Sequence, residues 1–169
     1  MGMEIERKYL IRMPEIGLLD GLCAEKWDIT QAYLLAAAGA TERVRRIRDR
    51  EGERYFHTVK RRISALSCME DEEEITREAY QDFLLRRDPA RRAIEKTRFR
   101  IPYEAHLLEF DVYPFWQEAV VLEIELTGED DSAAYPAWVE VLADVTADLR
   151  FKNVSLAKQL PDIREFLKD

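Results

Sequence analysis

The feature that most constrains this chain is a row of charges at alternate positions near its N-terminus. In the stretch MEIERKYLI, the residues Glu4, Glu6 and Lys8 alternate with more apolar neighbours. Successive side chains of a strand point to opposite faces, so this stretch predicts a strand with one charged and one largely apolar face. The charged face either meets solvent or lines an interior that binds a charged ligand. One strand does not distinguish these two cases, so the pattern of the other predicted strands is needed.

The same alternation recurs in six further segments. These segments contain Arg43 and Arg45, Thr58 and Lys60, Glu72 and Glu74, Lys96 and Arg98, Glu109 and Asp111, and Glu123 and Glu125. Most carry one sign of charge, whereas solvent faces usually mix both signs, and like charges on one face repel. Carboxylate clusters favour a hard divalent cation, and arginine and lysine clusters favour phosphate. The alternative is a network of salt bridges without a ligand, which would carry a heavy desolvation cost.

Strand-like segments dominate the chain, and helices are few. We predict strands near 3–12, 28–35, 41–50, 54–63, 70–76, 92–102, 105–113 and 119–127, and helices near 14–22, 77–87, 132–145 and 161–169. Thr76 is the expected N-cap of the second helix, with Arg86 and Arg87 in its last turn. Asp131 or Ser132 is the expected cap of the third. This arrangement predicts an α+β, mainly β, fold: a closed or nearly closed antiparallel sheet with a charged lumen and helices packed outside.

Composition restricts the class of protein. The 169 residues fit a single domain over 1–169, and the net charge of −8 argues against non-specific nucleic-acid binding. No apolar run reaches membrane-spanning length, and charges begin at Glu4. We therefore expect no membrane partner, no signal peptide and a cytoplasmic location. Cys23 and Cys68 belong to no metal or disulfide motif, so we expect reduced, structural thiols.

Taken in order, these motifs resemble those of CYTH-domain proteins, the triphosphate tunnel metalloenzyme family. The family motifs are E-x-E-x-K, Q-x-Y-L, R-x-R, T-x-K, E-x-E, K-x-R, E-x-D, a late E-x-E, and D-V-T followed by R-Y-x-N. They match, in this order, Glu4–Lys8, Gln31–Leu34, Arg43–Arg45, Thr58–Lys60, Glu72–Glu74, Lys96–Arg98, Glu109–Asp111, Glu123–Glu125 and Asp144–Asn153. The resemblance implies an eight-stranded antiparallel barrel, a tunnel, and a triphosphate substrate bound with Mg²⁺ or Mn²⁺.

The register of the arginine pair is open. The chain continues past Arg45 with Arg46 and Arg48. Either Arg43 and Arg45 or, one residue out of step, Arg46 and Arg48 face the lumen.

One position departs from the family pattern. Many relatives have an arginine two residues before the E-x-E motif that is Glu72–Glu74 here, and this chain has Glu70 at that position. Arg61, Arg62 and Arg77 are alternative cations, so the group that holds one of the phosphates is open.

The resemblance also implies roles for the charged residues of the lumen. Expected triphosphate-binding residues are Lys8, Arg43, Arg45, Lys60, Lys96, Arg98 and Lys152. Expected metal ligands are Glu4, Glu6, Asp111, Glu123 and Glu125. Lys8 is expected to steer the attacking water or to protonate the leaving phosphate, and Glu125 to orient that water, with Glu109 as the alternative.

The expected reaction is metal-dependent hydrolysis of a triphosphate, with inorganic tripolyphosphate split into diphosphate and phosphate. Because a fold does not determine its chemistry, four alternatives stay open: an adenylate cyclase of the class IV type, a thiamine triphosphatase, a nucleoside triphosphatase, and a non-catalytic polyphosphate-binding module. The expected partner is the small-molecule substrate, and the chain is expected to be a monomer or a homodimer.

Overall fold

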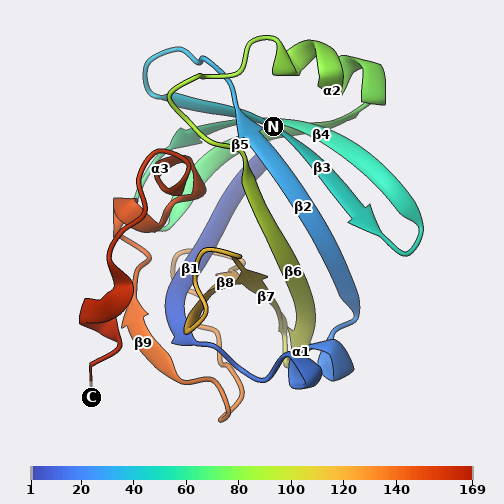
Figure 1. The fold of residues 1–169 in the computed structure, drawn as a ribbon. Helices are drawn as coiled ribbons and strands as arrows, with labels where there is room; N and C mark the ends of the chain where they lie inside the picture. Colours follow the sequence, from blue (N-terminus) through green and yellow to red (C-terminus); the bar gives the residue numbers. More distant parts are fainter. Residues whose placement is uncertain (1, 169) are drawn as a thin grey trace.

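Eight antiparallel strands close into a barrel in residues 2–168, the part of the chain that the computed structural model describes (Figure 1). Around the ring the strands follow the order β5-β4-β3-β2-β6-β7-β8-β1, and β1 pairs back with β5. The strands are β1 (Gly2–Arg12), β2 (Glu25–Tyr33), β3 (Ala40–Asp49), β4 (Gly52–Arg62), β5 (Ser67–Ile75), β6 (Ile94–Tyr103), β7 (His106–Val112), β8 (Ala119–Glu125) and a ninth, β9 (Val141–Asp144). The predicted barrel of eight strands is therefore confirmed.

Strand β1 closes the barrel because one of its edges is divided between two partners. Residues 2–5 pair with β5, and residues 9–11 pair with β9 on the same side. Its other edge pairs with β8 over residues 6–12. Without β9, the second half of β1 would leave backbone donors and acceptors unpaired at the point where β5 ends.

The helices are short, and none of those described forms part of the barrel wall (Figure 1). They are α1 (Ile16–Leu22), α2 (Arg77–Leu84), α3 (Asn153–Leu156), and the 3₁₀ turns η1 (Leu149–Phe151) and η2 (Ile163–Phe166). The predicted N-cap of α2 is confirmed, because the hydroxyl of Thr76 accepts a hydrogen bond from the Ala79 amide at 3.1 Å. The helix ends at Leu84, so the placement of Arg86 and Arg87 in its last turn was wrong.

The predicted helix over 132–145 is also wrong. Residues 132–140 form no helix, and the chain continues as strand β9. The free edge of β1 offers backbone hydrogen bonds to this segment, and Tyr135 and Trp138 pack against the apolar outer face of the barrel. The helix predicted over 161–169 is reduced to the turn η2 among the described residues.

The apolar side chains form a core on the outside of the barrel and a plug at one end. On the outside, Leu108, Phe110 and Leu122 pack with Leu19 of α1. The plug combines inward-facing strand ends with the C-terminal segment; its buried members include Leu10, Tyr33, Ile94, Val121, Phe151 and Leu156. The charged lumen lies between this plug and the opposite end. Among the described residues, no helix has the length and apolar character needed to cross a membrane.

Candidate active site

The lumen holds a cavity of about 540 Å³, within the usual size range of small-molecule sites. All eight barrel strands and the segment around η1 and α3 line it. Ten of the predicted site residues are in this lining: Glu4, Glu6, Lys8, Arg43, Arg45, Lys60, Arg98, Glu123, Glu125 and Lys152. The structure does not place Lys96 and Asp111 in the lining. The charged row of β1 therefore faces the inside of the barrel.

The arginine pair of β3 that faces the cavity is Arg43 and Arg45. Arg46 lies on the outer face within 3.5 Å of the Thr30 hydroxyl, and Arg48 forms an exposed ion pair with Glu53. Because side chains alternate along a strand, only one of the two pairs can line the lumen.

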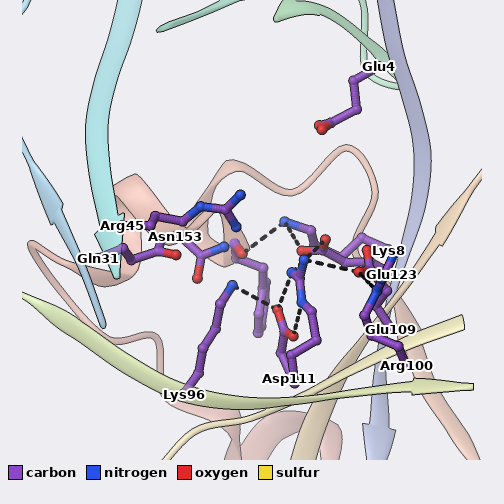
Figure 2. A network of polar contacts seen from close by, with 12 residues as sticks. Glu4, Lys8, Gln31, Arg45, Lys96, Arg100, Glu109, Asp111, Glu123 and Asn153 are labelled. Atoms are coloured by element: carbon purple, nitrogen blue, oxygen red, sulfur yellow. Dashed lines mark hydrogen bonds and ion pairs between the residues drawn. The ribbon is translucent and has the colours of Figure 1, made fainter. Parts of the chain in front are cut away.

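A buried cluster joins β1, β6 and β8. The Lys8 ammonium lies 3.4 Å from Glu123, and the Arg98 guanidinium lies 3.4 Å from the other oxygen of the same carboxylate. Burial alone would lower the pKa of Lys8, but Glu123 and Glu6 raise it above its ordinary value. Lys8 therefore keeps its proton at neutral pH and acts as a fixed positive charge. In Figure 2, Lys8 and Glu123 lie on one side of the lumen, opposite Arg45 and Asn153.

Asp111 lies behind this cluster and holds two cations. Its carboxylate accepts hydrogen bonds from Lys96 at 2.8 Å and from Arg98 at 2.7 and 2.8 Å (Figure 2). The Asp111 side chain is fully buried, and that of Lys96 is 1% exposed. Burial lowers the pKa of Lys96 to about 8, against the opposing effect of Asp111. The bidentate contact sets the direction of the Arg98 guanidinium, whose edge then reaches the cavity.

Lys60 is shared by two carboxylates at a different level of the lumen. Its ammonium lies 2.9 Å from Glu4 and 3.4 Å from Glu70. Burial alone would raise the pKa of Glu4, but Lys60 and a hydrogen bond with Glu70 lower it to about 2. The pKa of Glu70 rises to about 7 because of burial and the charge on Glu4. Glu4 stands apart from the Lys8 cluster in Figure 2.

Two carboxylates of the lining have no cation of their own. Within residues 2–168, Glu6 and Glu125 take part in no side-chain hydrogen bond and no ion pair. Burial raises the pKa of Glu6 to about 8, assisted by the charges on Glu123 and Glu4. Burial, Glu4 and Glu109 also raise the pKa of Glu125. In the metal-free protein Glu6 therefore keeps a proton at neutral pH, because the cations beside it do not compensate the charge of its carboxylate.

Strand β3 carries cations whose charge or hydrogen-bond donors are not fully matched by neighbouring anions. Arg43 is 9% exposed, forms no ion pair with the described residues, and has a buried Nε without an acceptor. The buried Nε of Arg45 also lacks an acceptor, although its Nη2 lies 2.9 Å from Glu72. Lys152, which also lines the cavity, has no ion-pair partner among these residues. Unsatisfied buried donors are rare, and here they belong to arginines that line a cavity large enough for an anion.

The donor set fits a hard divalent cation, because the carboxylates of the lining supply only oxygen ligands. In residues 2–168, however, no three acidic, histidine or cysteine side chains already converge as ligands of one ion. Glu4 and Glu123 are held by lysines, whereas Glu6 and Glu125 are not. An ion in this region would replace lysine contacts as it bound.

Three charged strand residues of the lining, Arg62, Glu70 and Arg100, lie outside the charged rows recognised in the sequence, although Arg62 was one of the alternative cations. Each continues the alternation of a strand already assigned to the lumen, since Arg62 follows Lys60 and Arg100 follows Arg98 at a spacing of two. Glu70 precedes Glu72 in the same way. Extending each charged row to the end of its strand would have found all three.

Comparison with known proteins agrees with this geometry. No model of a known protein family matches the chain. The inorganic triphosphatase of Nitrosomonas europaea is 32% identical over 163 residues, covering 94% of this chain and 99% of that protein. The crystal structure of the inorganic triphosphatase NE1496 superimposes with a TM-score of 0.59 at 28% identity, over 96% of this chain and 99% of that one.

A more distant solved structure shares the fold. The PH1819 protein from Pyrococcus horikoshii is 18% identical, with a TM-score of 0.59 over 76% of this chain and 80% of that chain. The identity and near-complete coverage of the Nitrosomonas protein, together with the closed barrel and its charged lumen, establish the relationship. The chain belongs to the CYTH-domain family of triphosphate tunnel proteins that includes this inorganic triphosphatase.

Proposed function

We propose that the protein hydrolyses inorganic tripolyphosphate to diphosphate and phosphate, with Mg²⁺ or Mn²⁺ as cofactor. The observation that carries the proposal is that one cavity contains both a cation without an anion and a carboxyl group without a cation. Arg43 is a buried cation without an ion-pair partner among the described residues, and Glu6 is a half-buried carboxyl group without one. A complex of a divalent ion with a polyphosphate would compensate both. The name and the 32% identity of the Nitrosomonas relative support the choice of an inorganic substrate.

Binding the substrate is the task of the cations in the lining. Arg43, Arg45 and Arg98 offer planar guanidinium groups that pair with phosphate oxygens through two hydrogen bonds each. Lys60 and Lys152 add point charges. Lys96 and Asp111, which lie outside the lining, act on the substrate only by orienting Arg98. This replaces the expected direct roles of Lys96 in phosphate binding and of Asp111 in metal binding.

The metal would be held by Glu4, Glu6, Glu123 and Glu125. When bound, such an ion neutralises phosphate charge and polarises the bond that breaks. Glu125 orients the attacking water and accepts its proton, because it has no cation partner and a raised pKa. Glu109, the alternative base, already accepts hydrogen bonds from Arg98 and Arg100. The water oxygen bonds to the terminal phosphorus, and diphosphate leaves with the bridging oxygen.

Lys8 stabilises the charge that develops on the leaving diphosphate. Its raised pKa makes it a poor proton donor at neutral pH, so its contribution is electrostatic. The cytoplasmic location and the monomeric or homodimeric state remain predictions.

The test is phosphate release from tripolyphosphate, ATP and thiamine triphosphate, each with Mg²⁺, Mn²⁺ or EDTA, while cyclic AMP is followed in the ATP reactions. The proposal predicts release from tripolyphosphate that needs a divalent ion. Cyclic AMP with diphosphate from ATP would instead identify a cyclase. Tight binding of tripolyphosphate without turnover would identify a non-catalytic module.

A further inference from the structure

A second pocket lies next to the cavity in which we place the triphosphate. A pocket of about 310 Å³ adjoins the lumen and is lined by Gly2, Met3, Glu4, Glu70, Glu72 and Glu125. We call it the acidic vestibule. Four of its six lining residues are glutamates, and all four also line the main cavity. A substrate that extended from the lumen in this direction would meet four carboxylates, and the described lining offers it no cation.

The cations near the vestibule are already engaged. Lys60 is paired with both Glu4 and Glu70, and the Arg45 guanidinium is paired with Glu72. Among the described residues, the unengaged cations of the lumen are Arg43, Arg62 and Lys152, which line the main cavity and not the vestibule. The lining of the vestibule therefore contains carboxylates and no cation, although Arg43 in the main cavity feels the charges of Glu4, Glu70 and Glu72.

We infer that Glu70 is a specificity-determining residue that limits the substrate to three phosphates. The inference rests on the proposed triphosphatase function. Glu70 has two effects: it holds Lys60 together with Glu4, and it adds a carboxylate to the side on which a fourth phosphate would lie. At the other end, the apolar plug around Leu10 and Phe151 occupies the barrel. Within residues 2–168, a longer polyphosphate that extends into the vestibule thus meets no lining cation and meets an additional anion.

The test compares tetrapolyphosphate with tripolyphosphate as substrates of the wild-type protein and of Glu70→Gln, at saturating Mg²⁺. The assay is run at about pH 8.5, well above the ordinary pKa of a glutamate. Removing one negative charge beside a bound phosphate is expected to raise the ratio of kcat/KM for tetrapolyphosphate to that for tripolyphosphate about five- to tenfold. Glu70→Arg is expected to raise it further.

The matched control is Asp71→Asn, which removes the same charge from the next residue of β5. Asp71 is exposed and points to the opposite face of the strand, so the ratio is expected to stay at the wild-type value. Thermal unfolding of each variant shows that the barrel is intact.

An unchanged ratio in a folded Glu70→Gln protein overturns the inference. So does an equal fall in turnover of both substrates, because that result would make Glu70 a metal ligand. Failure of the wild-type protein to cleave tripolyphosphate would instead overturn the proposed function, and this is visible before any variant is compared.

Discussion

Replacing Glu6 by glutamine is expected to stabilise the metal-free protein. Glu6 is a half-buried carboxylate whose pKa is about 8, against an ordinary value of 4.5. The folded protein therefore binds a proton that the unfolded chain releases between these two values. The stability that this proton contributes is present below about pH 4.5 and is lost as the pH rises through about 8. At about pH 9, the wild-type protein bears the full cost of the buried charge, and Glu6→Gln does not.

The size of the effect follows from the pKa. The displacement of the Glu6 pKa corresponds to at most about 5 kcal/mol. A buried glutamine amide is itself partly unsatisfied, so we expect a gain of roughly 2–3 kcal/mol at about pH 9. For a chain of this length, that gain raises the unfolding temperature by roughly 5–10 °C. Below about pH 3.5, where Glu6 is largely protonated in both states, the two proteins are expected to unfold at similar temperatures.

The assay is calorimetric unfolding of both proteins across this pH range in EDTA and then in Mg²⁺. Mg²⁺ is expected to raise the unfolding temperature of the wild-type protein more than that of Glu6→Gln, because the ion uses the uncompensated carboxylate. Glu4→Gln is the matched variant, and it is expected to change the free energy of unfolding in the opposite direction. The pKa of Glu4 is about 2, so its loss removes a favourable pair with Lys60 and is expected to cost roughly 1–2 kcal/mol. A Glu6→Gln protein less stable than wild type at high pH would refute the reasoning.

Three further predictions follow from single contacts. Arg43→Met is expected to raise KM for tripolyphosphate at least tenfold with little change in stability, because Arg43 has no partner among the described residues. The control is Arg46→Met on the outer face. Equal KM values in the two variants would contradict the assignment of Arg43 to substrate binding. Asp111→Asn is expected to destabilise the protein by about 3–5 kcal/mol in urea unfolding, because it leaves Lys96 and Arg98 buried and poorly paired. If this variant unfolded at the same urea concentration as the wild-type protein, the pairing would contribute nothing to stability. Thr76→Ala is expected to cost about 1 kcal/mol through loss of the α2 cap, with unchanged turnover, and a fall in turnover would link α2 to the site.

The sequence predicted the strands and their lumen-facing sides well, because an alternating pattern determines the face of each side chain. Eight strands were expected and eight close the barrel, and Glu4, Arg43, Arg98 and Glu123 all line the cavity as expected. The alternating pattern does not determine how far a side chain lies from the cavity. Asp111 has the correct parity, but the cations Lys96 and Arg98 enclose it behind the cavity wall.

The remaining errors arose where long-range pairing overrides local preference. Residues 132–145 have the composition of a capped helix, yet Val141–Asp144 form strand β9 because β1 leaves an edge free only in the assembled barrel. The pairing of Lys60 with Glu4 across the β1–β5 junction also joins residues 56 positions apart. No local pattern indicates which carboxylates of the lumen already have a cation and which do not.

We propose that a divalent ion and a triphosphate occupy this lumen and that the terminal phosphate is cleaved there. Phosphorus NMR of tripolyphosphate with the wild-type protein, first in EDTA and then in excess Mg²⁺, tests this proposal. We expect a stable spectrum in EDTA and, once Mg²⁺ is in excess, conversion to diphosphate and phosphate in equal amounts. Conversion at the same rate in EDTA, or persistence of tripolyphosphate in Mg²⁺ with a folded barrel, would contradict it.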